Sequence, residues 1–416
     1  MKILRLLGYF IFLYPLYMSF IWMIGGLLFS IRREQAGSVK LDYHPFFSII
    51  IPAYNEEGSI EVIVDNLGYL NYPHYEVIVV NDGSTDKTAE IVDNLVLKHP
   101  SWLKVVHLKE NKGKANALNM GILISKGQFL VTIDADCLLD KEAINWFAWH
   151  LLSHPRVGAI TGNPRVWNRT SLLARIQTGE YATIIGLIKR TQRILGKILT
   201  VSGVIAAYRT SALLDVGFFE GDTVTEDIDI TWKLQKKFWD VRYEPRALCW
   251  ILVPETIRGL WHQRVRWAQG GLQVLIKHAD IWLDIRERRF WPIYVEYLVS
   301  IIWAFSLTLV TIIWLILIIV KSTGHAVPIF ANPIYPEWYG AVLCLACLLV
   351  FCVSFIIDRK YEKSFMQNYF WVVWYPMVYW IIITLTTIKA VYNVTIKKKA
   401  GASWKSPDRG LHTLKP

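Results

Sequence analysis

Three short polar segments carry side chains that could catalyse a group transfer. Asp134-Ala135-Asp136 ends an apolar run, Thr225-Glu226-Asp227 begins a helical pattern, and Gln263-Arg264-Val265-Arg266-Trp267 follows. Together they offer a carboxylate pair for a metal ion, a base and a face that bears a cation. All three lie in one polar region flanked by hydrophobic stretches of membrane-spanning length. The combination favours sugar transfer at a membrane.

Asp227 has two interpretations. Thr225 is a favourable N-cap, and acidic residues in the first turn of a helix interact well with its dipole. A carboxylate at this position could also accept the proton of an attacking sugar hydroxyl, as general-base catalysis requires. Spacing alone does not separate a helix cap from a catalytic base.

Asp134 and Asp136 are one residue apart and can share a hard divalent cation, Mg²⁺ or Mn²⁺. Diphosphate oxygens and water would complete its coordination. Lys114, within Asn111-Lys112-Gly113-Lys114-Ala115-Asn116, is a candidate further contact to the phosphates. The Asp-x-Asp spacing is weak evidence by itself, since many surface turns contain it.

Gln263, Arg266 and Trp267 fall at i, i+3 and i+4, so they share one face of a helix. The surrounding apolar stripe also fits an amphipathic helix at a membrane surface. Both interpretations can hold, because such a helix would bring an arginine to the diphosphate and an indole to a sugar face.

Secondary-structure patterns show how these segments are positioned. From residue 41 to about 283, β-rich runs alternate with helical stretches, which is typical of parallel βαβ units in one open sheet. The predicted strands are 47–51, 76–80, 104–107 and 129–133, and the predicted helices are 59–70, 86–97, 114–125 and 141–153.

Polar residues follow three of these four strands, where ligands of such sheets bind. Tyr54 and Glu56 follow the first, Asp82 the second, and Asp134 and Asp136 the fourth. The motif after the second strand is also ordinary turn chemistry. Turns, however, do not require acids at three strand ends. The first three residues could bind the base and ribose of a nucleoside-diphosphate sugar.

The composition predicts membrane spans, because 53% of the 416 residues are apolar. Uncharged stretches of spanning length are 6–31, 297–320, 338–357 and 364–388. A cleaved signal peptide is the alternative for the first, but its apolar run is too long. Pro376 could break the last stretch into a re-entrant pair, which would leave the tail inside.

Basic residues predict the orientation. They follow the first span, precede the second and separate the third from the fourth, at Arg32, Arg33, Arg286, Arg288, Arg289, Arg359, Lys360 and Lys363. This distribution places residues 41–283 in the cytoplasm. A fully spanning last segment would put Lys397 to Lys399 outside, against that tendency. The net charge of +11 gathers beside the spans, which favours anionic lipid and a diphosphate substrate over nucleic acid.

The motifs, taken in order, resemble those of the processive glycosyltransferases of family 2. They are Pro-Ala-Tyr-Asn-Glu, Asn-Asp-Gly-Ser-Thr-Asp, Gly-Lys-Ala-Asn-Ala-Leu-Asn, Asp-Ala-Asp, Thr-Glu-Asp and Gln-Arg-Val-Arg-Trp, within residues 47–277. Segments 161–165, 176–178, 180–182, 188–190, 243–250, 252–257 and 259–261 are similar to the bacterial poly-β-1,6-N-acetyl-D-glucosamine synthases of that family. Thr200-Val201-Ser202-Gly203-Val204 stands where cellulose synthases carry Phe-Phe-Cys-Gly-Ser, which argues against cellulose.

The resemblance implies an α/β, Rossmann-like cytosolic domain of the GT-A type, with an open, mostly parallel sheet and transmembrane helices at both ends. The expected divisions are an N-terminal span (1–33), the GT-A domain (41–255), amphipathic interfacial helices (256–290), C-terminal spans (291–392) and a basic tail (393–416). The implied location is the bacterial inner membrane.

The implied reaction is processive, inverting transfer of N-acetylglucosamine from UDP-GlcNAc to a growing poly-β-1,6-N-acetyl-D-glucosamine chain, coupled to export of a biofilm exopolysaccharide. Asp227 would be the base, and Asp134 and Asp136 would hold the diphosphate and its metal. Tyr54, Glu56 and Asp82 would bind the uridine. Gln263, Arg266 and Trp267 would line the acceptor and leaving-group side.

The resemblance also implies a small accessory membrane subunit, and no appended regulatory domain is expected. Hyaluronan-like or chitin-like synthesis is the alternative polymer reaction, and transfer of one sugar to a polyprenyl phosphate is a further one. The Gln-x-x-Arg-Trp motif favours a polymer. A membrane receptor or channel with a non-catalytic sugar-binding domain is the rival class, and the intact Asp227 speaks against it.

Overall fold

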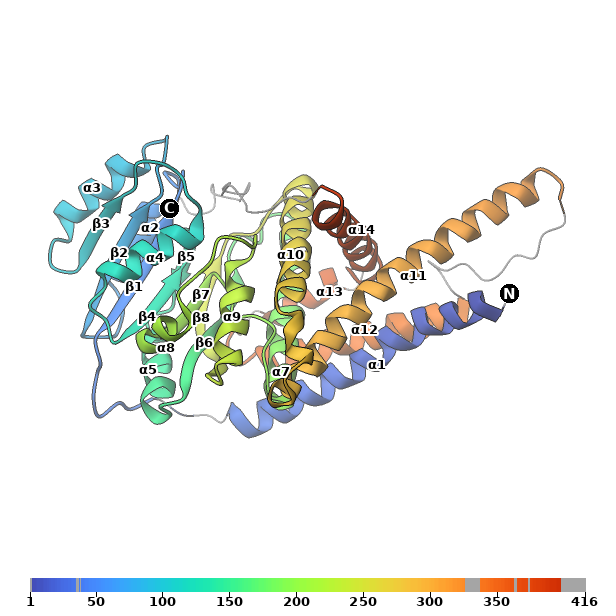
Figure 1. Ribbon diagram of the computed structural model, residues 1–416, viewed down its shortest axis with the longest axis horizontal. Helices are drawn as coiled ribbons and strands as arrows, with labels where there is room; N and C mark the ends of the chain where they lie inside the picture. The colour runs from blue at the N-terminus through green and yellow to red at the C-terminus, as the bar shows by residue number, and fades with distance from the viewer. Residues whose placement is uncertain are drawn as a thin grey trace.

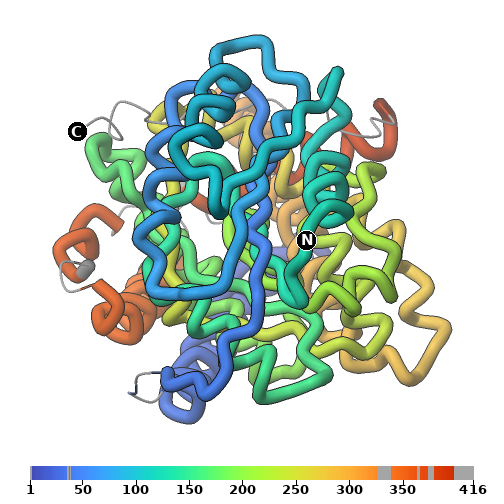
Figure 2. The backbone as a smooth tube through the Cα atoms, turned by 90° about the vertical axis from the view of Figure 1, so that its left-hand side faces the viewer, coloured from blue at the N-terminus to red at the C-terminus, as the bar shows by residue number. Residues whose placement is uncertain are grey.

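The computed structural model describes residues 2–34, 37, 39–325, 337–362, 365–372 and 375–397. An α/β domain built on one sheet lies at one end, and long helices extend from it (Figure 1). Helix α1 (Lys2–Arg33) packs along α11 (Trp291–Ser322) and α12 (Glu337–Asp358). Figure 2, viewed from the end that holds the sheet, shows the blue and teal chain of the α/β domain in front of these helices.

The sheet has eight strands in the order β3-β2-β1-β4-β7-β6-β8-β5. Strands β1 to β4 form a parallel set, β7 runs antiparallel to β4 and β6, and β8 pairs parallel with β6 and antiparallel with β5. Their bounds are Phe47–Ala53, Tyr75–Asn81, Leu103–His107, Phe129–Ile133, Cys137–Leu139, Val157–Val166, Ile205–Arg209 and Asp240–Ile251 for β1 to β8. The prediction of an open, mostly parallel sheet is confirmed.

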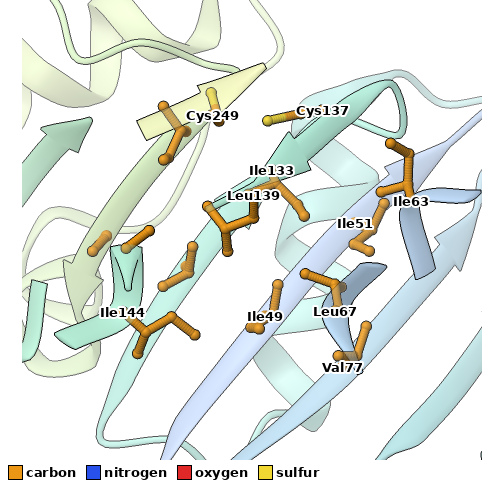
Figure 3. Close-up of a cluster of buried hydrophobic side chains, with 14 of the residues drawn as sticks. Ile49, Ile51, Ile63, Leu67, Val77, Ile133, Cys137, Leu139, Ile144 and Cys249 are labelled. Carbon is orange, nitrogen blue, oxygen red and sulfur yellow. The ribbon is translucent and has the colours of Figure 1, made fainter. Parts of the chain in front are cut away.

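The four predicted strands correspond to β1 to β4, and the four predicted helices are present between and after them. These are α2 (Ile60–Leu67), α3 (Thr88–Lys98), α4 (Lys114–Ile124) and α5 (Ala143–Ser153). Strand β1 is buried throughout because helices cover both faces of the sheet. Ile49 and Ile51 pack with α2 and α5, as Figure 3 shows, whereas Ile50 packs with α4 on the opposite face.

The second half of the domain contains the two helices expected at Thr225 and at Gln263, and it adds others that the sequence patterns did not delimit. Residues 172–195 form one helical segment, consisting of α6 (Leu172–Glu180), the π-helix η1 (Tyr181–Leu187) and α7 (Ile188–Leu195). Helices α8 (Thr210–Val216) and α9 (Glu226–Lys236) contribute Leu213 and Ile230 to the core beside α4. The long helix α10 (Ile257–Lys277) then leads through η2 (Ala279–Trp282) and η3 (Ile285–Phe290) to α11.

Three helical segments of the described chain are long and apolar enough to span a membrane. They are Lys2–Arg33, Ile285–Ser322 and Tyr339–Asp358, which confirms the first three predicted spans. The fourth predicted span, 364–388, is not among them: its described residues belong to η4 (Phe365–Asn368), α13 (Tyr369–Val372) and α14 (Tyr375–Thr395).

Pro376 lies in the first turn of α14, where proline is tolerated, and α14 packs on α10 and α11. Of the predicted basic features, Lys363 and residues 398–416 lie outside the described residues.

A buried network of charges joins the α/β domain to the membrane helices. Arg190 of α7 is fully buried and binds Glu34, just after α1, with Nε 2.5 Å from Oε1. Its Nη2 lies 2.8 Å from Oδ1 of Asp358, the last residue of α12. Arg165 of β6 also contacts Asp358, and Lys360 contacts Glu34. Charges this deeply buried are tolerated only when they are paired.

Arg190→Met should therefore leave two buried carboxylates short of their common partner and destabilise the protein by about 3–5 kcal/mol. We expect a clear fall in the Tm of the purified chain in lipid nanodiscs. Arg156→Met is the matched control, because Arg156 is exposed and its loss should change stability by less than about 1 kcal/mol. Equal Tm values for the two variants would contradict the role of the network.

Candidate functional site

A cavity of about 530 Å³ lies between the α/β domain and the membrane helices. Seven of the predicted site residues line it: Lys114, Asp134, Asp136, Asp227, Gln263, Arg266 and Trp267. The opposite wall is formed by α1, α11, α12 and α14, with Trp22, Glu296, Cys347 and Trp380 among its residues. The cavity thus continues from the polar strand ends into the membrane-helix bundle.

The loops after β1 and β2, which carry the other three predicted residues, are fastened to each other. The Asn55 amide donates to Ser84 Oγ at 3.0 Å, the Thr85 amide donates to Asn55 Oδ1 at 2.8 Å, and the Glu56 amide donates to Thr88 Oγ1 at 2.8 Å. These bonds bring Tyr54, Glu56 and Asp82 to neighbouring strand ends. None of the three lines the cavity.

Asp82 connects these loops to the cavity through the backbone. Its fully buried carboxylate accepts hydrogen bonds from the amides of Lys112 (3.1 Å) and Gly113 (2.8 Å). Burial raises the pKa of Asp82, although the two amides oppose this shift. Gly113, with φ of +91°, is the N-cap of α4, so Asp82 fixes the point at which Lys114 begins the helix.

Lys114 links the carboxylates of two separate motifs. Its ammonium lies 2.6 Å from Asp134 Oδ1 and 3.2 Å from Glu226 Oε1, and it donates to the carbonyl of Gly203 at 3.3 Å. Burial alone would lower the pKa of Lys114, but the two carboxylates outweigh it and raise the pKa above its usual value. Lys114 is therefore a fixed cation beside Asp134.

Asp227 has the environment of a base that works near neutral pH. Its Oδ2 accepts from the Gly203 amide at 3.1 Å and its Oδ1 from the Ile228 amide at 3.0 Å. Burial, followed by the charge of Glu226, raises its pKa to about 6, while Lys114 and Arg266 act in the opposite direction. A carboxylate with this pKa is ionised at pH 7 and basic enough to take a proton from a hydroxyl.

The alternative interpretation of the Thr-Glu-Asp motif, a helix cap, finds limited support. Thr225 occupies the N-cap position of α9, but its side chain makes no capping hydrogen bond. It instead packs against α10 at Gly270, where an added Cβ would lie only 2.0 Å from Thr225 Oγ1. The motif brings α9 and α10 into close contact beside the cavity.

Helix α10 presents Gln263, Arg266 and Trp267 to the cavity, as the i, i+3, i+4 spacing predicts. Gln263 Oε1 is buried and has no hydrogen-bond partner among the described residues, so it can accept from a ligand. Arg264, between them, binds Glu180 at 2.6 Å and lies 4.1 Å from the centre of the Trp267 ring. This contact holds the indole in place.

Asp134 and Asp136 supply oxygen donors of the kind that hard divalent cations prefer, and both face the cavity. Their chemistry fits a metal ion. A second acidic group lies elsewhere, where carboxylate oxygens of Glu220, Asp222 and Asp229 are within 4.8 Å of one another. Lys277 contacts all three at 2.5, 2.9 and 3.0 Å, so an ammonium already balances this group.

Sequence patterns missed several residues of the cavity. Glu180, Lys189 and Ser202 all line it, and they come from α6, α7 and the turn before β7. Each lies in a segment that the sequence analysis used only for the family resemblance and to which it gave no chemical role. The available signal was the pair of adjacent cations Lys189 and Arg190 directly after the apolar run 184–188, because such charges have no reason to be buried unless they are functional or paired.

Comparisons with known proteins agree with this geometry. The model of the family described as "Glycosyltransferase like family 2" matches residues 44–270. The chain is 38% identical over 413 residues to the poly-beta-1,6-N-acetyl-D-glucosamine synthase of Staphylococcus epidermidis, covering 96% of this chain and 98% of that protein. It is 37% identical over 412 residues to the synthase of the same name from Staphylococcus aureus strain MSSA476, with the same coverage of both proteins.

The fold is also similar to that of a solved mannosyltransferase from Pyrobaculum calidifontis in complex with GDP-Man and Mn²⁺. The TM-score is 0.68 at 22% identity, and the likeness covers 96% of this chain and 99% of that one. Identity to the staphylococcal proteins over nearly the whole chain, together with the family match, shows that the chain belongs to the family-2 glycosyltransferases, as a membrane-protein homologue of the poly-β-1,6-N-acetyl-D-glucosamine synthases.

Proposed function

We propose that this protein transfers N-acetylglucosamine processively from UDP-GlcNAc to a growing poly-β-1,6-N-acetyl-D-glucosamine chain, with inversion, and couples synthesis to export. The observation that carries the proposal is the shared cavity. Asp227, the Asp134 and Asp136 pair and the Gln263 face line it together, and it continues between helices that are long enough to span a membrane. The sugar and the linkage are inferred from the staphylococcal relatives.

The chemistry is one displacement. Asp227 accepts the proton of the acceptor's 6-hydroxyl, whose oxygen forms a bond to the anomeric carbon of the donor sugar. The bond from that carbon to the diphosphate breaks, and its electron pair leaves with UDP. Lys114 and Arg266 are the cations of the cavity that are placed to stabilise the negative charge on the departing diphosphate.

Asp134 and Asp136 would hold the divalent cation, Mg²⁺ or Mn²⁺. Such an ion, when bound, neutralises charge that develops on the diphosphate. Tyr54, Glu56 and Asp82 would contact the uridine from the neighbouring strand ends, and Gln263 and Trp267 would contact the acceptor sugar.

The basic residues that flank the spans support a cytosolic α/β domain, where UDP-sugars are available. Synthesis of a hyaluronan-like or chitin-like polymer is the alternative, and it would share all these roles. The names of the relatives favour the β-1,6-linked polymer over both.

Asp227→Asn should lower polymer formation by at least about 100-fold, because the amide cannot accept the proton. The assay is incorporation of label from UDP-N-acetylglucosamine by membrane vesicles supplied with magnesium, with an EDTA-treated sample that should lose activity. Asp222→Asn is the matched control, since Asp222 is exposed and lies outside the cavity. Full output from Asp227→Asn would refute the assignment of Asp227 as the base, and no polymer from the wild-type chain would favour a non-catalytic sugar-binding function.

The same vesicles test the donor substrate and the linkage separately. Consumption of UDP-glucose or UDP-glucuronate alone would refute the substrate. A product that resists a β-1,6-specific glycosidase would refute the linkage and leave the substrate intact.

The raised pKa of Asp227 predicts the pH dependence. The base must be ionised, so kcat/KM should be level above pH 7 and fall about tenfold per pH unit as the pH drops below about 6. An unperturbed aspartate would hold the activity down to about pH 4. Measuring UDP release between pH 5 and 8 in one ionic background tests this, and a profile that is flat down to pH 5 would contradict the buried environment of Asp227.

We also propose a small accessory membrane subunit. The resemblance suggests it, and the three candidate spans of the described residues are few for enclosing a polysaccharide, whose path must be shielded from lipid. Co-expression with a candidate small membrane protein should raise export more than synthesis. Full synthesis and extrusion by this chain alone, reconstituted as a monomer in liposomes, would refute the proposal.

A further inference from the structure

Lys189 is a buried cation whose position the proposed reaction does not yet explain. Its side chain lines the cavity from α7, and the residue is only 5% exposed. Its ammonium donates to Ser202 Oγ at 2.6 Å and to Thr161 Oγ1 at 3.2 Å. Among the described residues no carboxylate lies within ion-pair distance of it. An ammonium buried without an acid is strongly unfavourable, so a specific role should offset the penalty.

The turn that Lys189 holds is in direct contact with Asp227. The Ser202 amide donates to Thr161 Oγ1 at 2.8 Å, which fixes the first half of the turn to β6. The next amide, that of Gly203, donates to Asp227 Oδ2 at 3.1 Å. Two consecutive residues therefore connect the buried ammonium to the carboxylate.

Gly203 packs tightly against both Asp227 and Lys114. A Cβ at that position would lie 3.1 Å from Asp227 Oδ2 and 3.3 Å from Lys114 Nζ. The glycine backbone thus fills the space between the base and the cation that binds Asp134. A small shift of the turn would move the hydrogen bond on Asp227, and a displacement of about 1 Å in a catalytic group can lower a rate about 100-fold.

We propose that Lys189 is a positioning residue for the transfer reaction: its ammonium holds the Ser202-Gly203 turn against Asp227, so that the carboxylate keeps the orientation needed to take the acceptor proton. This inference rests on the proposed function, because it assigns Lys189 a part in the reaction that Asp227 carries out.

The charge of Lys189 should affect the pH profile of the reaction, which a lysine that serves only packing would not do. Glu226 on its own helix, Lys114 from α4 and Arg266 from α10 shift the pKa of Asp227, and Asp227 in turn shifts the pKa of Lys189 from α7. Burial lowers the pKa of Lys189 to about 7, and Asp227 partly opposes that shift. Lys189 is thus mostly protonated at pH 6, and removing its charge should move the pKa of Asp227 upward.

The test measures UDP release from UDP-GlcNAc by the full chain in lipid nanodiscs, as kcat, KM and a pH profile. We expect Lys189→Met to lower kcat by about 10- to 100-fold, to leave KM for UDP-GlcNAc unchanged and to shift the acidic limb to higher pH. Lys189→Arg keeps the charge and should return the acidic limb towards its original position.

Ser202→Ala provides a second variant that removes only the hydroxyl. It should lower kcat by about three- to tenfold, the effect of one lost hydrogen bond. In the double variant with Lys189→Met the two losses should not add, because both act through one contact. Ser202→Ala decides the question if Lys189→Met fails to fold.

Lys197→Met is the matched control. Lys197 is also partly buried and follows α7, but it donates to the carbonyl of Gln235 and lies outside the cavity. It should keep the kcat and pH profile of the wild type.

Wild-type values in both Lys189→Met and Ser202→Ala would overturn the inference. A fall in kcat accompanied by a lower Tm and an unmoved acidic limb would also overturn it, since that pattern indicates a purely structural lysine. A wild-type enzyme that releases no UDP from UDP-GlcNAc would instead refute the proposed function.

Discussion

The pairing of Arg190 with Glu34 and Asp358 is the constraint on which the rest of the structure depends. The cavity has one wall made of strand ends and another made of membrane helices, so it exists only if these parts keep a fixed relation. Apolar packing between helices resists sliding weakly, whereas a buried charge has few positions in which both of its partners are satisfied. Arg190 joins the ends of α1 and α12 to α7, and this fixes the α/β domain against the membrane helices.

Inside the cavity, charges are shared between motifs that are far apart in sequence. Lys114 contacts the carboxylate of Asp134 and that of Glu226, and the turn at Gly203 lies between Lys114 and Asp227. The residues expected to bind the metal and the residue expected to remove the proton are thus electrostatically coupled. Binding of a cation beside Asp134 would compete with Lys114 for that carboxylate, and through it would alter the field at Asp227.

Local patterns predicted the first half of the domain well. Strands β1 to β4 are short and rich in apolar residues, so composition and length identify them within one or two residues. The motif residues of α10 share a face because helical spacing is fixed. In both cases the determining information lies within about ten consecutive residues.

The remainder depends on contacts that no local pattern contains. Arg264 binds Glu180 across 84 positions, and Lys189 meets Thr161 across 28. Thr225 has the ideal identity for a cap, yet the close approach of α10 at Gly270 directs its side chain elsewhere. The stretch 364–388 has the length of a span, but its last part, within α14, packs on α10 and lines the cavity. Tertiary packing overrides the local preference in each case.

The π-helix η1 between α6 and α7 determines in which direction the side chains of α7 point. Each residue of an α-helix turns the chain by about 100°, and the wider turns of a π-helix change that rotation before α7 begins. Consequently Glu180, before η1, and Lys189, after it, both reach the cavity, while the adjacent Arg190 points into the network at the membrane helices. One short irregular segment thereby sets the direction of two neighbouring cations: Lys189 toward the cavity, and Arg190 toward Glu34 and Asp358 at the ends of the membrane helices.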